Sequence, residues 1–303
     1  MTEPTTSVPV VDEREFSVAA RSQWKTIVRR FLRHRPAMIS LFVLTSITLF
    51  VFIFPYFWEW PFTKRDKLSL SKSPSWAHPF GTDGLGKDVM GRVMRGTQRS
   101  LEIAIIASFL ITTIGVFLGA IAGYFRGWID AIIMRFTDLV LTIPLLIIVA
   151  VVSVGYPGSP WYTIPVILGI FAWTGLARIV RAEFMSLREK EFVEAARAVG
   201  ARDRRIIFRH ILPNIAGPII VAATLSIAGT MITETALSFL GLGVLPPDVS
   251  LGQLIQESLT AFKTRPWLFW FPSAAIVLIC LCVNFIGDGL RDAFDPKQNR
   301  IKA

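Results

Sequence analysis

The chain carries one stretch whose spacing could bind a phosphate group. Residues 81–88, Gly-Thr-Asp-Gly-Leu-Gly-Lys-Asp, match a phosphate-binding loop at every fixed position except the last. Asp88 stands there in place of the Ser or Thr hydroxyl that would hold magnesium, and no buried strand precedes the loop. We therefore expect a glycine-rich turn that leads into an interfacial helix over residues 89–99.

A second candidate is a carboxylate inside an apolar stretch. Glu234 lies in the run 215–240, and an ionisable side chain inside a membrane span is costly, so it is a candidate for function. Thr230, Thr233 and Ser238 lie near it on a helix and could line a polar translocation path with it. The alternative is that Glu234 pairs with an arginine of a neighbouring helix or of a partner and only holds the bundle together.

Other polar residues carry weaker signals. Asp138 could line a path or pair with Arg135, and Asn284 fits a hydrogen bond between helices. His210 could relay protons or bind a metal, but no second histidine or cysteine is placed to help it, so we expect a packed or solvated side chain. The sequence shows no paired His or Cys cluster and no nucleophile with a base, which argues against an integral membrane enzyme.

The longest polar insert in the second half of the chain spans residues 194–214. Apolar residues recur around its start at i, i+3, i+4 and i+7, which places them on one stripe of a short amphipathic helix. The stripe consists of Phe192, Ala195, Ala196 and Val199. The spacing predicts a helix with charge on the other side.

The end of this insert predicts a second short helix. Gly200 can adopt the left-handed conformation that closes the first helix, and Asp203 can cap the next. Pro213 is expected to stop it, because its ring removes a backbone donor. The predicted product is a helix, a tight turn and a helix, with small residues where bulk would block close approach, placed between two membrane spans.

The elements that position these residues are expected to be membrane spans. A hydrophobic content of 52% and a mean hydropathy of +0.53 indicate a multi-span membrane protein. Gly115 and Gly119 permit close helix packing, and Pro144 predicts a kink in the third span. The six spans are expected at residues 37–58, 100–125, 129–154, 161–179, 215–240 and 267–286.

The charge pattern predicts the orientation of these spans. The net charge of +10 is spread between the apolar runs, which favours a positive-inside bias over a nucleic-acid surface. Of the 32 Lys and Arg residues, 22 fall on the side that holds both termini and the polar insert, so that side is expected to be cytoplasmic. The basic stretch 24–35 should lie along the headgroups with its apolar residues inward. Those apolar residues are Trp24, Ile27, Phe31 and Leu32.

The polar insert resembles the cytoplasmic signature of ATP-binding-cassette importer permeases. That signature reads Glu-Ala-Ala, three residues, Gly, nine residues, then Ile-x-Leu-Pro, and Glu194-Ala-Ala, Gly200 and Leu212-Pro213 fit its spacing. One departure is His210 in place of Ile, which is similar to the peptide-importing branch. Residues 81–88, 238–247 and 287–296 resemble segments of the "C"-type oligopeptide and dipeptide permeases, so the resemblance covers about residues 24–298.

The resemblance implies an all-α membrane protein with six transmembrane helices, the transmembrane domain of a type I importer with cytoplasmic coupling helices. It assigns residues 1–36 to a cytoplasmic tail with an interfacial helix, 59–99 to an extracytoplasmic loop, 100–286 to the permease core and 287–303 to a cytoplasmic tail. The coupling segment is 183–213. The residues expected at the ATPase contact are Glu194, Ala195, Ala196, Gly200, His210, Leu212 and Pro213.

The implied function is a non-catalytic permease subunit in the bacterial inner membrane that takes up oligopeptides or dipeptides. The implied partners are a second homologous permease, two ATPase subunits or domains, an extracytoplasmic substrate-binding protein and lipid, with no nucleic acid. ATP and magnesium belong to the ATPases, and no cofactor or metal is expected on this chain. In this setting Glu234 could meet a peptide's ammonium group. The same architecture could instead carry nickel or another small solute, and a channel or ion-driven transporter is a further alternative.

Overall fold

The computed structural model describes residues 23–156 and 158–295, and its regular elements within these ranges are helices and two isolated bridges. Five of these helices are long and apolar enough to cross a membrane. A bent pair of shorter helices gives a sixth span if the two are counted together, so the all-α prediction is confirmed with five or six candidate spans. Residues 1–22 of the predicted N-terminal tail, the Trp24 side chain and residues 296–303 of the predicted C-terminal tail lie outside the described part.

The chain consists of long helices that form a bundle and short helices that connect them. They are α1 (Gln23–Arg33), α2 (Arg35–Ile53), α3 (Val89–Phe125), α4 (Gly127–Thr142), α5 (Leu145–Gly155), α6 (Thr163–Ala172), α7 (Thr174–Leu187), α8 (Glu191–Ala198), α9 (Asp203–Arg205), α10 (Ala216–Phe239), α11 (Leu251–Ser258) and α12 (Trp267–Phe294). A π-helical turn, η3 (Ile206–Ile211), and a 3-10 turn, η4 (Leu212–Ile215), connect α9 to α10.

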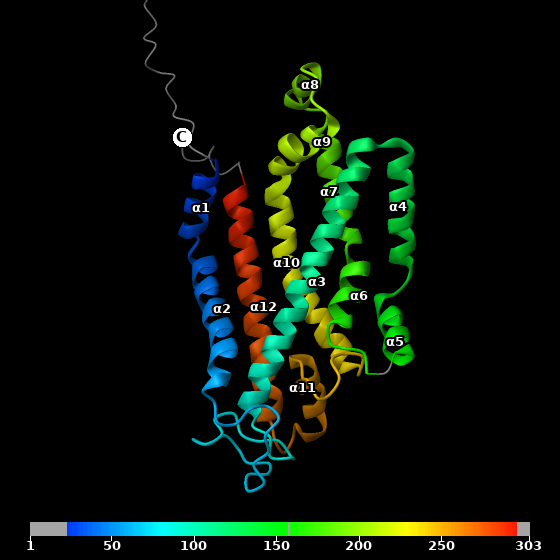
Figure 1. Cartoon of the computed structure of the whole chain (residues 1–303). Coiled ribbons are helices and arrows are strands. Elements are labelled where there is room, and N and C mark those ends of the chain that lie inside the picture. Colours follow the sequence, from blue (N-terminus) through cyan, green and yellow to red (C-terminus); the bar gives the residue numbers. More distant parts are fainter. Residues whose placement is uncertain (1–22, 157, 296–303) are drawn as a thin grey trace, which may run out of the picture.

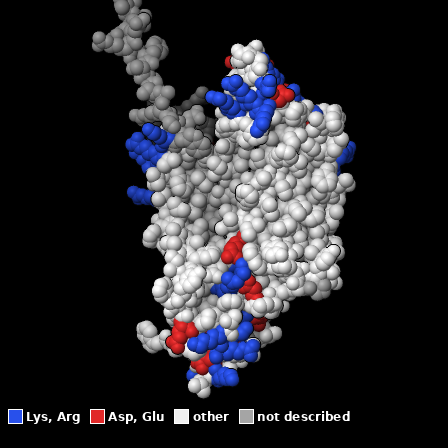
Figure 2. All heavy atoms as spheres, viewed as in Figure 1, with Lys and Arg blue, Asp and Glu red and all other residues white. Residues whose placement is uncertain are grey.

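The long helices stand side by side, with α2 at one edge of the bundle and α4 at the other (Figure 1). The helix α8 protrudes from the end that also holds α1 and the last turn of α12, while α11 and the loop between α2 and α3 lie at the opposite end. In the face shown in Figure 2, charged residues gather at these two ends, a narrow column of them rises from the lower end to about the middle, and an uncharged band separates this column from the upper end. This distribution is typical of a bundle that crosses a bilayer.

The helix α3 begins earlier than the predicted second span. The side chain of Asp88 accepts a hydrogen bond from the Gly91 amide at 2.7 Å, which caps the helix, and α3 then runs unbroken for 37 residues. The prediction of a separate interfacial helix over residues 89–99 was therefore wrong. The arginines in the first turns of α3 pair with acidic side chains of the protein, as described below. The predicted glycine-rich turn before the helix is confirmed, since Gly81 and Gly86 have φ values of +76° and +74°.

The third span is broken where a kink was predicted. The helices α4 and α5 meet at an angle of 70°. Pro144 occupies the N-cap position of α5, and Ile143 before it is extended, with ψ at 117°. Because a proline crowds the preceding residue out of the helical region, the two segments form separate helices.

The predicted close packing of glycines is confirmed on α3. A Cβ atom at Gly119 would lie 2.5 Å from the Ala177 carbonyl oxygen, and one at Gly123 would lie 2.6 Å from the Arg181 carbonyl oxygen. A Cβ at Gly115 would meet Leu176 at 3.0 Å. The helices α3 and α7 therefore touch backbone to backbone, which requires glycine at these positions.

This contact gives the first prediction. Gly119→Leu is expected to lower the free energy of unfolding by about 3 kcal/mol, because the added side chain forces α3 away from α7. Gly229→Leu on α10 is the matched control, since no atom of residues 23–156 or 158–295 lies within 4 Å of a Cβ there. Thermal melting of both variants in detergent measures the difference. Equal melting temperatures for the two variants would contradict the proposed backbone contact.

Several spans extend beyond their predicted ends. The fourth span continues through α7 to Leu187, and α12 continues to Phe294, so the first part of the predicted C-terminal tail is helical. The helix α11 forms between the fifth and sixth predicted spans, where Ser250 caps it by accepting from the Gln253 backbone amide at 3.3 Å.

The helix α1 confirms the predicted basic helix but not its predicted position. Figure 1 shows α1 continuing in the direction of α2, beside the end of α12. The Arg30 guanidinium donates to the Asp295 carbonyl oxygen at 3.0 Å, and His34 lies 3.5 Å from the Asp292 carboxylate. These contacts hold α1 against the end of α12, because α12 extends far enough to reach it.

Candidate functional site

The helix α8 is the most protruding element at its end of the bundle (Figure 1). Phe192 is 40% exposed and Val199 is 85% exposed, and Ala195 between them is exposed as well. Ala196 is buried, so it leaves the predicted stripe and faces the interior with Val193. The exposed apolar stripe therefore consists of Phe192, Ala195 and Val199, and we call it the α8 surface.

The turn after α8 has the geometry of a glycine-closed helix end. Gly200 has a φ of +78°, and its amide donates to the Arg197 carbonyl oxygen at 2.9 Å. The Ala201 amide donates to the Ala196 carbonyl oxygen at 3.0 Å. These two bonds make a Schellman motif, in which the left-handed residue is usually glycine. The predicted role of Gly200 in closing the helix is confirmed.

Two other predictions about this segment were wrong. Asp203 does not cap the following helix; Arg202 holds that position, and the Asp203 carboxylate accepts from the Tyr124 hydroxyl at 2.6 Å. Pro213 does not stop the helix, because the hydrogen bonding changes from π-helical to 3-10 around it and its missing donor breaks nothing. The chain from Asp203 to Phe239 therefore forms one continuous helical span of 37 residues.

A buried apolar cluster attaches the α8 surface to the membrane helices. Ile206, Ile211 and Ile215 are at most 1% exposed and pack with Phe184 of α7 and Val193 of α8. These contacts join α8 to the spans on both sides of it. Movement of α8 must therefore move α7 and α10 as well.

The remaining residues expected at this surface lie at its base. His210 and Leu212 are half-buried, and Pro213 is exposed. The His210 carbonyl oxygen accepts from the Asn214 side-chain amide at 2.5 Å. Glu194 is exposed beside the α8 surface. No group of three His, Cys, Asp or Glu residues within the described ranges is placed to hold a metal ion.

The second candidate site surrounds Glu234, which is fully buried within α10. The Ser238 hydroxyl donates to one carboxylate oxygen at 2.6 Å, and the Ser100 hydroxyl lies 3.2 Å from the other. The Ser250 hydroxyl lies 3.2 Å from that of Ser238. Within the described residues Glu234 has no lysine or arginine partner, so the alternative of an arginine pairing is not realised in this chain.

The sequence could not have indicated Ser100 and Ser250. They belong to α3 and to the N-terminus of α11, and the Ser100 hydroxyl also accepts from the Leu251 amide at 3.2 Å. The Glu234 carboxyl therefore connects three segments, α3, α10 and α11. We call Glu234, Ser100, Ser238 and Ser250 the carboxyl–serine cluster.

The two threonines predicted near Glu234 stand apart from this cluster. Thr230 is buried, and the Thr233 hydroxyl donates to the Gly229 carbonyl oxygen at 2.9 Å on the partly exposed side of α10. Asp138 pairs with Arg178 of α7 at 2.7 Å and not with Arg135 of its own helix.

A charge cluster joins α3 to the segment before α11. Arg95 donates to Asp248 at 2.8 Å, and Arg99 donates to the same carboxylate. Burial raises the pKa of Asp248, but the hydrogen bonds from Arg95 and Arg99 lower it more, so the net pKa lies below its ordinary value. The ionised carboxylate therefore stabilises the fold.

This depressed pKa gives a pH prediction. Asp248 contributes its full stabilisation above its ordinary pKa of 3.8, and that contribution is lost as the pH falls through the lower folded value. We expect the melting temperature of the native protein to exceed that of Asp248→Asn at pH 6, and the difference to shrink below about pH 4. Melting curves of both proteins measure it. A difference that stays constant down to pH 3 would contradict the assigned role.

Comparisons with known proteins agree with this architecture. Residues 115–300 match the family model of the binding-protein-dependent transport system inner membrane component. Residues 22–74 match the model of the N-terminal TM domain of oligopeptide transport permease C.

Two similar relatives cover nearly the whole chain. The oligopeptide transport system permease protein OppC of Mycobacterium tuberculosis H37Rv is 40% identical over 91% of this chain and 95% of its own length. The protein of the same name from Haemophilus influenzae is 40% identical over 94% of this chain and 92% of its own length. The fold is similar to that of an inward-facing structure of the MetNI methionine ABC transporter, with a TM-score of 0.56, 20% identity and coverage of 68% of this chain and 97% of that one.

Proposed function

This chain belongs to the binding-protein-dependent inner membrane components, the permease subunits of ATP-binding-cassette importers, and from this we propose that it carries oligopeptides or dipeptides across the membrane. It is a multi-pass inner membrane protein and a non-catalytic subunit, since ATP hydrolysis in this family belongs to separate ATPase subunits. The peptide substrate follows from the relatives' names and from the match of the N-terminal model.

The observation that carries the proposal is the α8 surface. Exposed Phe192 and Val199 flank Ala195 on a helix that protrudes from the bundle, and a stripe of this kind suits insertion into a groove of a partner protein. The partner proposed is the ATPase subunit. The contact residues proposed are Glu194, Ala195, Gly200, His210, Leu212 and Pro213, with buried Ala196 supporting the helix from within.

The complete importer proposed here holds this chain, a second homologous permease, two ATPase subunits or domains and an extracytoplasmic binding protein. ATP and magnesium are bound by the ATPases. We propose that the end with α8 and both termini is cytoplasmic, which the 22 of 32 basic residues predicted on that side support. The end with α11 then faces outward.

The polar residues of α10 are proposed to serve the translocation pathway in two ways. Thr233 lies on the partly exposed side of α10 and can face the solute directly. Thr230, Glu234 and Ser238 are buried behind it in this conformation and hold the wall of the pathway. A solute would meet Glu234 only in a conformation that separates α11 from α10.

Uptake into vesicles tests the substrate class. The complete importer, reconstituted with its binding protein and internal ATP, is expected to accumulate a labelled hexapeptide at least ten times faster than vesicles without ATP. Nickel ions offered in the same assay test the alternative solute. Accumulation of nickel without accumulation of peptides of two to six residues would replace the peptide proposal with that alternative.

A further inference from the structure

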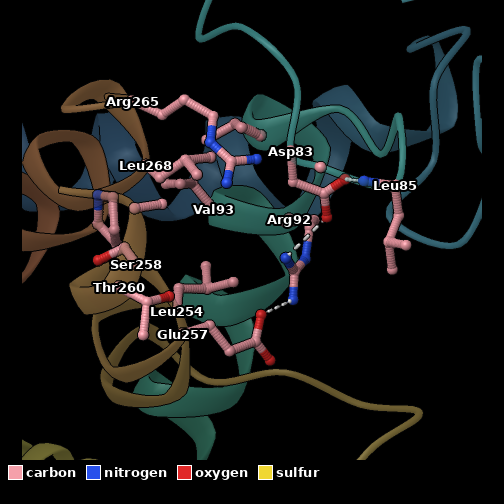
Figure 3. Close-up of a pocket in the computed structure, with 14 residues that line it drawn as sticks. Asp83, Leu85, Arg92, Val93, Leu254, Glu257, Ser258, Thr260, Arg265 and Leu268 are labelled. Atoms are coloured by element: carbon pink, nitrogen blue, oxygen red, sulfur yellow. Dashed lines mark hydrogen bonds and ion pairs between the residues drawn. The ribbon is translucent and has the colours of Figure 1, made fainter. Parts of the chain in front are cut away.

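A cavity of about 210 Å³ lies at the end of the bundle opposite to α8. Its wall combines the loop before α3, the first turns of α3, the helix α11 and the start of α12 (Figure 3). Leu254 and Leu268 contribute apolar surface, and the charged residues are Asp83, Arg92, Glu257 and Arg265. Neither the carboxyl–serine cluster nor the α8 surface includes this cavity.

The two carboxylates of the cavity already have donors. The Asp83 carboxylate accepts from the Leu85 and Lys87 amides, both at 2.8 Å, and from Arg92 at 3.1 Å. The Glu257 carboxylate accepts from Arg92 at 2.6 Å and from the Gln253 amide group at 3.0 Å. Both carboxylates are therefore already paired with cationic or amide donors of the chain.

Among the charged residues of the wall, Arg92 and Arg265 carry N–H groups that have no partner within the described residues. The Arg92 Nε is buried and has no hydrogen-bond partner within the described residues. Arg265 donates one Nη1 bond to the Ser71 hydroxyl at 3.0 Å and forms no ion pair with a carboxylate of the described chain. In Figure 3 its side chain reaches from the α12 side across toward the loop that carries Asp83. A ligand that uses these donors offers acceptor atoms.

The loop leaves space for the Arg265 guanidinium. A Cβ atom at Gly84 would lie only 2.8 Å from the Arg265 Nη1, so a larger residue there would displace the guanidinium. A guanidinium with two free N–H groups on one edge matches a carboxylate in a two-pronged contact. Arg265 can therefore form an ion pair with a carboxylate from outside the chain.

We propose that this cavity receives one carboxylate side chain, an Asp or Glu of the extracytoplasmic binding protein, on Arg265. The inference rests on the proposed function, which places this end of the bundle outside. The volume suits a single side chain and is too small for a peptide of several residues. The apolar wall packs against the stem of that side chain, and Arg265 binds its charged head.

Binding of the binding protein to the complete importer in nanodiscs tests the proposal. Arg265→Gln is expected to weaken the affinity for the binding protein about tenfold, and Arg265→Lys less, because lysine keeps the charge without the planar fork. The control is Lys263→Gln, an exposed cation two residues away that does not line the cavity and is expected to bind like the native importer. Unchanged affinity of both Arg265 variants would overturn the proposal.

A second experiment distinguishes a carboxylate side chain of the binding protein from the C-terminal carboxylate of the transported peptide. Hexa-alanine is supplied as the free acid and as the C-terminal amide, and peptide-stimulated ATPase activity is measured with native and Arg265→Gln importers. Equal loss of stimulation with both peptides supports a side chain of the binding protein. If only the free acid loses stimulation and the affinity for the binding protein stays native, the peptide's own terminus is the occupant and the proposal fails. Absence of any peptide stimulation in the native importer would instead refute the proposed function.

Discussion

Gly200→Trp is expected to reduce peptide uptake at least tenfold while the protein still inserts and assembles. Gly200 has a φ of +78°, which an L side chain adopts only with strain, and it directly follows the exposed Val199. Nothing in the described part of the chain lies within 4 Å of a Cβ at Gly200, so an indole there projects outward at the α8 surface. The indole would therefore obstruct a docked ATPase more than the fold of this chain.

The matched control for this variant is Gly200→Asn, because asparagine tolerates the left-handed conformation and is small. It should retain most of the uptake. The measurements are peptide accumulation in vesicles and ATP hydrolysis by the same preparation, with Glu194→Arg as an independent change at the same surface. Normal accumulation by Gly200→Trp vesicles would remove the α8 surface from the coupling mechanism.

Glu234→Gln is expected to reduce peptide uptake about tenfold while the importer assembles in normal yield. The amide keeps the volume of the carboxyl group but presents an NH₂ donor to one of the two serines that now donate to it. The link between α10, α3 and α11 therefore weakens without a cavity being formed. Initial uptake rates and the yield of intact complex from detergent give the two quantities.

Ser250→Ala is the companion variant for Glu234, since it leaves the carboxyl group in place and removes the α11 side of the cluster. It should lower uptake in the same direction. A complex that falls apart in detergent after Glu234→Gln would show that the carboxyl group only holds the bundle together, as the alternative interpretation of the sequence held.

The sequence predicted the spans well because apolar length alone decides whether a segment can cross a bilayer. It predicted the glycine contacts of α3 and the closure of α8 at Gly200, since both depend on a missing Cβ. It failed at Pro213, whose effect depends on the hydrogen bonding of neighbouring turns. At Pro144 the predicted kink is present, as a full break between α4 and α5.

Sequence periodicity does not identify contacts between residues that are far apart in the chain. Ser100 approaches Glu234 across 134 positions of sequence, and Asp248 meets Arg95 across 153. Ala196 has the same spacing as its exposed neighbours, yet the isoleucines of η3 cover it. A stripe identifies an apolar helix face, whereas the packing of a following segment decides how much of that face stays exposed.

The regular helix α10 has a mechanical consequence. At 1.5 Å per residue its 24 residues form a rod of about 36 Å, joined through η3 and η4 to the base of α8 at one end and holding the carboxyl–serine cluster near the other. A rod of this kind acts as a lever. A tilt imposed at α8 displaces the other end of α10 sideways. The displacement strains the serine hydrogen bonds of the carboxyl–serine cluster, which hold α11. Movement of the ATPase subunits proposed to dock at α8 and separation of α11 from α10 would then be linked through a rotation of α10.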